Sequence, residues 1–303
     1  MEACPRLTAV AELTHSRAIT KSAHILRSIA LLFLAACLCA LPATNPKLPW
    51  STADLVVWLA GLAFFFWTVS RLMLKQGPKP HERPFWLFVL LLVSYGWVIT
   101  SFPSAVVDRA SGGILELDKD PWMAFGTIDQ PSSVPYMISA SAIMMVFLMV
   151  LDFGTEKIGR VSLACAITIS GLTTALAGLC LHQSEDLSHI WNQNQVPGFV
   201  FGLFWYHGNA AAFLNLCWPV SLWLALKVHH RQSLRPAVHQ LSLAFLLVAL
   251  LLQITGVLVN VSKTGHVLLL LQGLLLGALW LKSGLPILPD GMLMKKRTWL
   301  ILL

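Results

Sequence analysis

The chain has 303 residues, of which 56% are hydrophobic and 12% are charged, and its mean hydropathy is +0.71. Soluble domains have about 25% charged residues, so this composition excludes a soluble globular protein and indicates a membrane protein. The net charge of +7 does not indicate nucleic-acid binding, because the basic residues lie in short clusters between apolar runs of membrane-spanning length. We therefore expect membrane lipid, and no nucleic acid, as a partner.

Eight apolar runs are long enough to cross a bilayer as helices, which takes about 20 residues each. They predict an all-α fold, a polytopic bundle of transmembrane helices near residues 26–42, 52–73, 85–102, 135–152, 162–181, 208–226, 241–259 and 265–282. The predicted organisation is a cytoplasmic N-terminal segment over residues 1–25 and a transmembrane domain over residues 26–303. The last residues, 298–303, resemble the start of a ninth helix. We expect the chain to be the front part of a longer protein, and the alternative is a tail that lies at the membrane interface.

The distribution of basic residues predicts the orientation, because lysine and arginine are retained on the cytoplasmic side. With the N-terminus inside, the inner segments hold 17 of the 21 lysines and arginines, Arg27 and Arg71 among them. Two long connections, near residues 103–134 and 182–207, then lie on the outer face, where we expect recognition to take place. Asp152, at an inner end, is the one clear acid within a spanning run, which disfavours a proton-coupled carrier.

The first candidate segment joins the second long outer connection to the sixth predicted helix. His207 and Asn209 lie where this helix begins, and the N–H groups and partial positive charge of a helix N-terminus suit a phosphate. Asn209 is also a predicted N-cap. The alternative is that Asn209 only caps the helix, that Gly208 and the following alanines only pack, and that His207 lies at the wet interface.

The second candidate segment is the short turn between the seventh and eighth predicted helices. It holds Lys263 at the outer surface beside the hydroxyls of Ser262 and Thr264, an arrangement that suits a pyrophosphate headgroup. The alternative is an ordinary lysine that extends its charge to the interface. His266, one turn further, is a candidate proton acceptor or hydrogen-bond donor to phosphate, or else it bonds a neighbouring helix.

The sequence contains none of the motifs GxxxxGK[ST], HExxH and GxSxG, and no CxxC. ATP-driven transport and the common hydrolase reactions therefore lose support, and we expect no cofactor and no metal.

These two segments resemble the bacterial O-antigen ligase and O-antigen polymerase superfamily. Residues 202–226 resemble a segment of that superfamily in which an arginine, a glycine and an asparagine precede an apolar helix, and residues 261–271 are similar to its short outer turn S-[RK]-x-G. The order and spacing agree, and the first 180 residues match in topology only. Gly202 and Asn209 match the pattern, Lys263 replaces the commoner arginine, and Phe199 stands where the pattern has arginine.

The resemblance implies a metal-independent glycan transfer on the outer face of the bacterial inner membrane, in lipopolysaccharide or exopolysaccharide assembly. The implied partners are an undecaprenyl-pyrophosphate-linked glycan and other envelope polysaccharide assembly proteins. In that superfamily arginines hold the pyrophosphate and a histidine in a later outer loop acts as base, so no catalytic residue is assigned here. The alternative function is a non-catalytic membrane partner or transporter-like subunit of the same assembly. The candidate substrate-binding residues are Lys263, Asn209, His207, Ser262, His266 and Gly202.

Overall fold

The computed structural model describes residues 5–40, 52–78, 82–102, 105–107, 114–116, 126–127, 130–183, 201, 204, 206–230 and 236–283. Eight long helices follow one another in this part of the chain: α1 (Pro5–Ala40), α2 (Thr52–Met73), α3 (Arg83–Ser101), α4 (Gln130–Gly154), α5 (Lys157–Gln183), α7 (His207–His229), α8 (Pro236–Val259) and α9 (Lys263–Ser283). Between α3 and α4, β1 (Ala105–Val107) and β2 (Ile114–Glu116) form an antiparallel hairpin in which Val106 pairs with Leu115.

The predicted all-α, polytopic fold is confirmed, because each predicted apolar run is a helix. Seven helices of the described chain are long and apolar enough to cross a membrane, and α9 adds a shorter apolar stretch over Lys263–Leu279. A helix satisfies its backbone hydrogen bonds internally, as the hydrocarbon core requires. The chain is a multi-pass membrane protein, and the two-stranded hairpin is the departure from a purely helical fold.

Helix α1 is longer than the sequence analysis predicts. Its 36 residues extend about 54 Å at about 1.5 Å per residue, beyond the hydrocarbon thickness of about 30 Å. Its apolar part, Ile19–Ala40, begins before the predicted start at residue 26. The predicted N-terminal segment is therefore helical from Pro5 onward and continuous with the first span.

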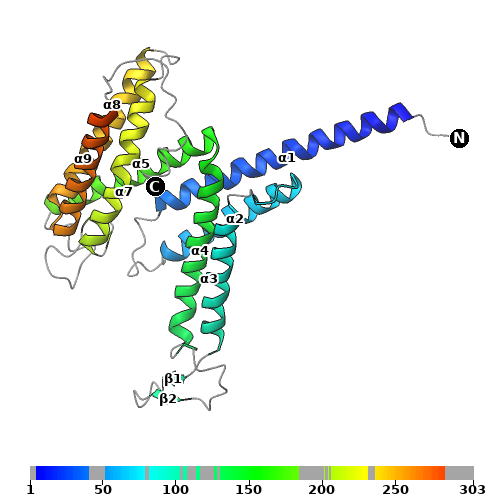
Figure 1. Ribbon diagram of the computed structural model, residues 1–303, viewed down its shortest axis with the longest axis horizontal. Coiled ribbons are helices and arrows are strands. Elements are labelled where there is room, and N and C mark those ends of the chain that lie inside the picture. Colours follow the sequence, from blue (N-terminus) through cyan, green and yellow to red (C-terminus); the bar gives the residue numbers. More distant parts are fainter. Residues whose placement is uncertain are drawn as a thin grey trace. The chain divides into compact units, whose positions relative to one another are not determined.

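The chain divides into two compact units, each described here by itself. The first unit is Met1–Thr174 with Leu203–Trp205, and the second is Ala175–Gly202 with Tyr206–Leu303. The first therefore holds α1 to α4 and most of α5, and the second holds the end of α5 together with α7, α8 and α9 (Figure 1).

In the first unit, small buried residues bring α1 and α2 together. Ala30 of α1 shares a core cluster with Ala63 of α2, and Cys37 of α1 shares another with Ala60 of α2. Small side chains let two membrane helices approach closely, which raises the van der Waals contact between them. Because the α1 positions are seven residues apart, they lie on one face of that helix.

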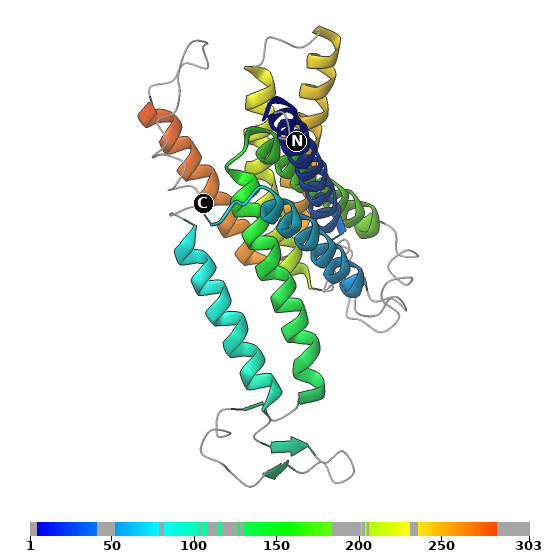
Figure 2. The same ribbon diagram turned by 90° about the vertical axis from the view of Figure 1, so that its right-hand side faces the viewer.

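Helices α3 and α4 run side by side, with the β1–β2 hairpin beyond their shared end (Figures 1 and 2). The indole Nε1–H of Trp97 in α3 donates to Ser141 Oγ of α4 at 3.0 Å. A hydrogen bond of this kind stabilises a membrane helix pair, because hydrocarbon offers the indole no alternative acceptor.

In the second unit, buried polar side chains connect α7 with α8 and α9. Ser221 Oγ of α7 donates to Gln253 Oε1 of α8 at 2.9 Å, and Trp218 Nε1–H donates to Gln272 Oε1 of α9 at 2.9 Å. The Gln272 amide in turn donates to the carbonyl of Asn215 at 3.1 Å. Apolar lipid does not favour one rotation of a helix over another, so these bonds set how the three helices face one another.

Candidate functional site

The beginnings of α7 and α9 meet in the second unit, and Asn260 is the residue that joins them. Its Nδ2–H donates to the carbonyl of His207, the first residue of α7, at 2.9 Å, while its Oδ1 accepts the N–H of Ser262 at 2.9 Å. Asn260 is 1% exposed, so both bonds are shielded from solvent. Through this one amide, the turn before α9 is held against the start of α7.

Ser262 is the N-cap of α9. Its Oγ accepts the N–H of Gly265 at 3.2 Å, and its carbonyl accepts the N–H of His266 at 3.2 Å. A serine hydroxyl in this position satisfies one of the helix's first N–H groups, all of which lack an acceptor within the helix. The hydrogen bond between Ser262 Oγ and the Gly265 N–H is therefore structural. Lys263 and Thr264 are the first two residues of α9.

The two helix starts approach closely because Gly265 has no side chain. A Cβ at this position would lie 2.5 Å from the Cβ of Ala211 in α7. The Asn215 amide of α7 fixes the same contact, since its Nδ2–H donates both to the carbonyl of Ala211 at 2.9 Å and to that of Gly265 at 3.0 Å. Asn215 is fully buried. Gly265, the glycine of the short-turn motif, and Ala211, in the alanine run of α7, thus allow α7 and α9 to pack closely.

A pocket of about 230 Å³ lies where the two helices begin. Its lining includes Tyr206, Gly208 and Asn209 from the start of α7 and Ser262, Thr264 and Gly265 from the start of α9. Partial positive charge accumulates at both helix N-termini, because their peptide dipoles point the same way along each axis. The combination of two helix N-termini with amide and hydroxyl groups suits an oxyanion.

The structure places the predicted site residues unequally around this pocket. Asn209 lines it and is exposed, whereas Lys263 stands between two lining residues with an exposed side chain that is not part of the lining. The ring of His207 packs against that of Tyr206, with centroids 4.6 Å apart. The Nε2 atom of His266 lies 3.2 Å from the carbonyl of Leu258, so this ring bonds α8.

The prediction that Asn209 is the N-cap of its helix is wrong: the cap is Tyr206, and α7 begins at His207, so Asn209 lies within the first turn. Gly202 lies outside the described residues. Among the residues that the structure describes, no group of three or more His, Cys, Asp or Glu side chains is arranged to hold a metal ion.

Sequence reasoning missed Asn260 and Tyr206. Asn260 stands two residues before Ser262, a spacing at which an asparagine side chain commonly bonds the backbone of a turn, so a local signal for it existed. For Tyr206 the only signal in the sequence was its position just before the predicted helix. Its place in the pocket lining was seen only in the structure.

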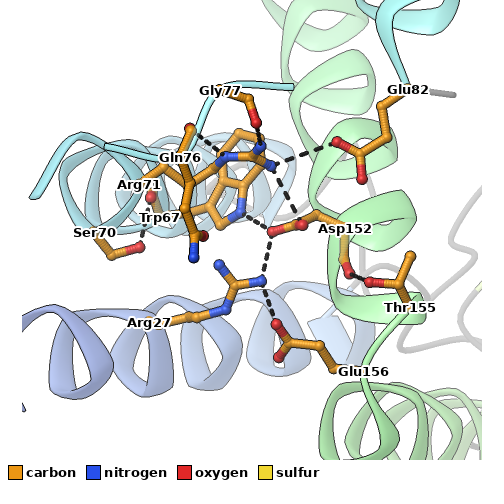
Figure 3. Close-up of polar contacts among 10 residues, drawn as sticks. All are labelled: Arg27, Trp67, Ser70, Arg71, Gln76, Gly77, Glu82, Asp152, Thr155 and Glu156. Carbon is orange, nitrogen blue, oxygen red and sulfur yellow. Dashed lines mark hydrogen bonds and ion pairs between the residues drawn. The ribbon is translucent and has the colours of Figure 1, made fainter. Parts of the chain in front are cut away.

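A second polar feature is a charge cluster in the first unit, formed by Arg27, Arg71, Glu82, Asp152 and Glu156 (Figure 3). Asp152 of α4 lies at its centre. Arg27 of α1 donates through Nη2 to Asp152 Oδ2 and to Glu156 Oε1, both at 2.7 Å. Arg71 Nη1 of α2 lies 3.3 Å from Asp152 Oδ1 and 3.8 Å from Glu82 Oε2.

Aromatic and backbone groups complete this cluster. The indole Nε1–H of Trp67 donates to Asp152 Oδ2 at 2.7 Å, and its ring stacks on that of Trp86 with centroids 5.5 Å apart. Arg71 also donates to the carbonyls of Gln76 and Gly77 in the turn that follows α2. Lys75, in the same turn, has a positive φ of 52°.

The charge cluster is internally compensated. Arg27, Arg71, Glu82 and Asp152 are all less than 10% exposed, and burying them is tolerated only because each charge lies against an opposite one. A charged group in a spanning segment suggests a functional role by default. Here the partners of each arginine come from the chain itself, so we assign the cluster to joining α1, α2 and α4.

No protein-family model matches the chain, and neither the curated proteins nor the solved structures contain a match.

Proposed function

We propose that this multi-pass membrane protein binds an undecaprenyl-pyrophosphate-linked glycan at the pocket between the starts of α7 and α9 and takes part in its transfer to an acceptor, as a glycan ligase or polymerase of bacterial surface polysaccharide assembly. The proposal locates the chain in the inner membrane, with the N-terminus in the cytoplasm and the pocket at the outer surface. The resemblance of residues 202–226 and 261–271 to the O-antigen ligase and polymerase superfamily supports it.

The observation that carries the proposal is the convergence of the two candidate segments. Asn209 and Thr264 are separated in sequence by most of α7 and by α8, yet both line one pocket, because Asn260 holds the carbonyl of His207. A pyrophosphate is a compact dianion or trianion that requires several donors from different directions. Two helix N-termini, an amide and a neighbouring lysine supply such donors in one place.

Lys263 lies next to this pocket along the chain, with an exposed side chain that is not part of the lining. It is the first residue of α9, and its neighbours Ser262 and Thr264 both line the cavity. The exposed ammonium group can swing over a bound headgroup and neutralise the leaving pyrophosphate as the glycosyl bond breaks. A lysine makes this contact as a point charge, without the bidentate fork of an arginine.

The experiment uses the full chain in lipid nanodiscs and undecaprenyl pyrophosphate as the probe. We expect Lys263→Ala and Asn209→Ala each to weaken binding, Lys263→Ala by about 10-fold or more because a contact to a charged group is lost. The control is Lys282→Ala, which removes an exposed lysine from the last turn of the same helix. Equal affinity of the wild type and both site variants would refute the pocket as the headgroup site.

A transfer assay separates the two functional classes. Transfer of a lipid-linked glycan to an acceptor, reduced in Lys263→Ala at unchanged protein level, supports the enzyme. Binding of the lipid without any transfer, together with stable co-purification of another envelope enzyme, would favour the non-catalytic partner instead.

A further inference from the structure

Tyr206 is a large aromatic residue that lines the pocket, and its ring contacts the ring of His207. It is the N-cap of α7, in extended conformation, and 42% of its surface is exposed. The ring of His207 packs against it at 4.6 Å between centroids, with a 50° angle between the planes. The ring also lies close to Gly208, where a Cβ would overlap Cε1 of Tyr206.

These contacts distinguish Tyr206 from an ordinary interfacial aromatic residue. A tyrosine that only anchors a helix in the headgroup region needs no glycine beside it and no pocket next to it. Here the absent side chain of Gly208 makes room for the ring, and the ring lines the same cavity as Asn209 and Thr264. The lining therefore includes a half-exposed aromatic residue together with residues that carry an amide and a hydroxyl.

This combination has the chemistry of a sugar-binding surface. A pyranose ring carries C–H groups on its faces and hydroxyl groups around its edge, so one face packs on an aromatic ring while the edge bonds amides and hydroxyls. The volume of about 230 Å³ is below the range of about 300–1,000 Å³ typical of drug-sized ligands. It is too small for an oligosaccharide, so only the sugar nearest the pyrophosphate can contact its lining.

We propose that Tyr206 is the stacking platform for the sugar attached directly to the pyrophosphate, and that Thr264 bonds a hydroxyl group at the edge of that sugar. This inference rests on the proposed function and deepens it, because it assigns recognition of the first sugar to Tyr206 and Thr264 and recognition of the pyrophosphate to the helix N-termini and Lys263. The pocket then selects a glycan by its first unit.

The test compares two probes on the full chain in nanodiscs, undecaprenyl pyrophosphate and the same lipid carrying a single N-acetylhexosamine. We expect the wild type to bind the sugar-bearing lipid about 3- to 10-fold more tightly, the range of an aromatic stacking contact. Tyr206→Ala should remove this preference, so that the ratio of the two affinities falls to about one, whereas Tyr206→Phe should retain most of it. Lys263→Ala should weaken both probes equally.

Tyr95→Ala is the matched control, because Tyr95 is an exposed tyrosine of α3 in the first unit. A sugar preference that persists in Tyr206→Ala, or a wild type that binds both lipids equally, overturns the platform and leaves the pyrophosphate site standing. Failure of the wild type to bind either lipid overturns the proposed function and the platform with it. Binding of the bare lipid by Tyr206→Ala, Tyr206→Phe and Tyr95→Ala reports that these variants are folded.

Discussion

Removal of the Asp152 carboxylate tests the assignment of the charge cluster. Asp152 accepts hydrogen bonds from Arg27 and Trp67 at 2.7 Å each and lies 3.3 Å from Arg71. In Asp152→Leu the two guanidinium groups, 9% and 6% exposed, lose their shared counter-charge. Breaking a buried ion pair on one side costs about 3–5 kcal/mol, so we expect a loss of stability in that range.

Glu156 provides the matched control. It accepts a bond of the same length from the same Arg27 nitrogen, but its side chain is 47% exposed. Water screens an exposed pair and solvates the arginine when the pair is lost, so Glu156→Gln should cost about 1 kcal/mol or less. The difference between the two acids thus reports the burial of Asp152 together with its contacts to Trp67 and Arg71, rather than the loss of one negative charge alone.

A double-mutant cycle makes the prediction sharper. In the double variant Arg27→Met with Asp152→Leu, Arg71 keeps Glu82 as its partner and no unpaired charge from Arg27 remains buried. We expect the double variant to be more stable than Asp152→Leu alone, with a coupling energy of about 1–3 kcal/mol.

The assay is equilibrium unfolding of the purified chain in mixed detergent micelles, followed by tryptophan fluorescence. The chain has 12 tryptophans, and Trp67 itself contacts Asp152, so the signal reports on the cluster. Equal destabilisation by Asp152→Leu and Glu156→Gln would refute the reasoning, as would a coupling energy of zero in the cycle.

The other predictions concern the junction of α7 and α9. Gly265→Ala should destabilise the chain by about 1–3 kcal/mol in the same unfolding assay, because the added Cβ would lie 2.5 Å from that of Ala211. Gly273→Ala, further along α9, is the control, because a Cβ at that position would contact no neighbouring atom within 4 Å. It should be neutral or stabilising by up to about 1 kcal/mol, and a loss of stability there would contradict the steric explanation. Asn260→Ala removes the amide that bonds the carbonyl of His207, so it should cost about 1–3 kcal/mol and also weaken undecaprenyl pyrophosphate binding, and unchanged binding would show that the pocket forms without this bond.

Local sequence predicted much of the helical framework. The predicted run over residues 52–73 has the same bounds as α2, and the run over 208–226 lies within α7, His207–His229. The end of α1 nearer the N-terminus was missed because residues 5–18 are polar, and hydropathy does not distinguish a helix that continues beyond the apolar core from an irregular segment.

The candidate site was predictable in part. The sequence singled out the segments around Asn209 and Lys263 from residue types that suit a phosphate, and the fold brings both segments to one pocket. The roles within it were less accessible: Ser262 is a cap, His266 bonds α8 and Tyr206 holds the N-cap position predicted for Asn209. Cap positions shift by one or two residues with little change in local pattern, so sequence alone resolves them poorly.

The sequence by itself determined which stretches span the membrane, because apolar length and backbone hydrogen bonding within a helix are local properties. Only the tertiary structure decided which polar side chains meet. Arg27 pairs with Asp152, 125 residues away, and Asn260 bonds the carbonyl of His207, 53 residues away. Such pairs depend on the rotation and register of each helix, which are set by the small residues and polar bonds at the helix contacts rather than by hydropathy.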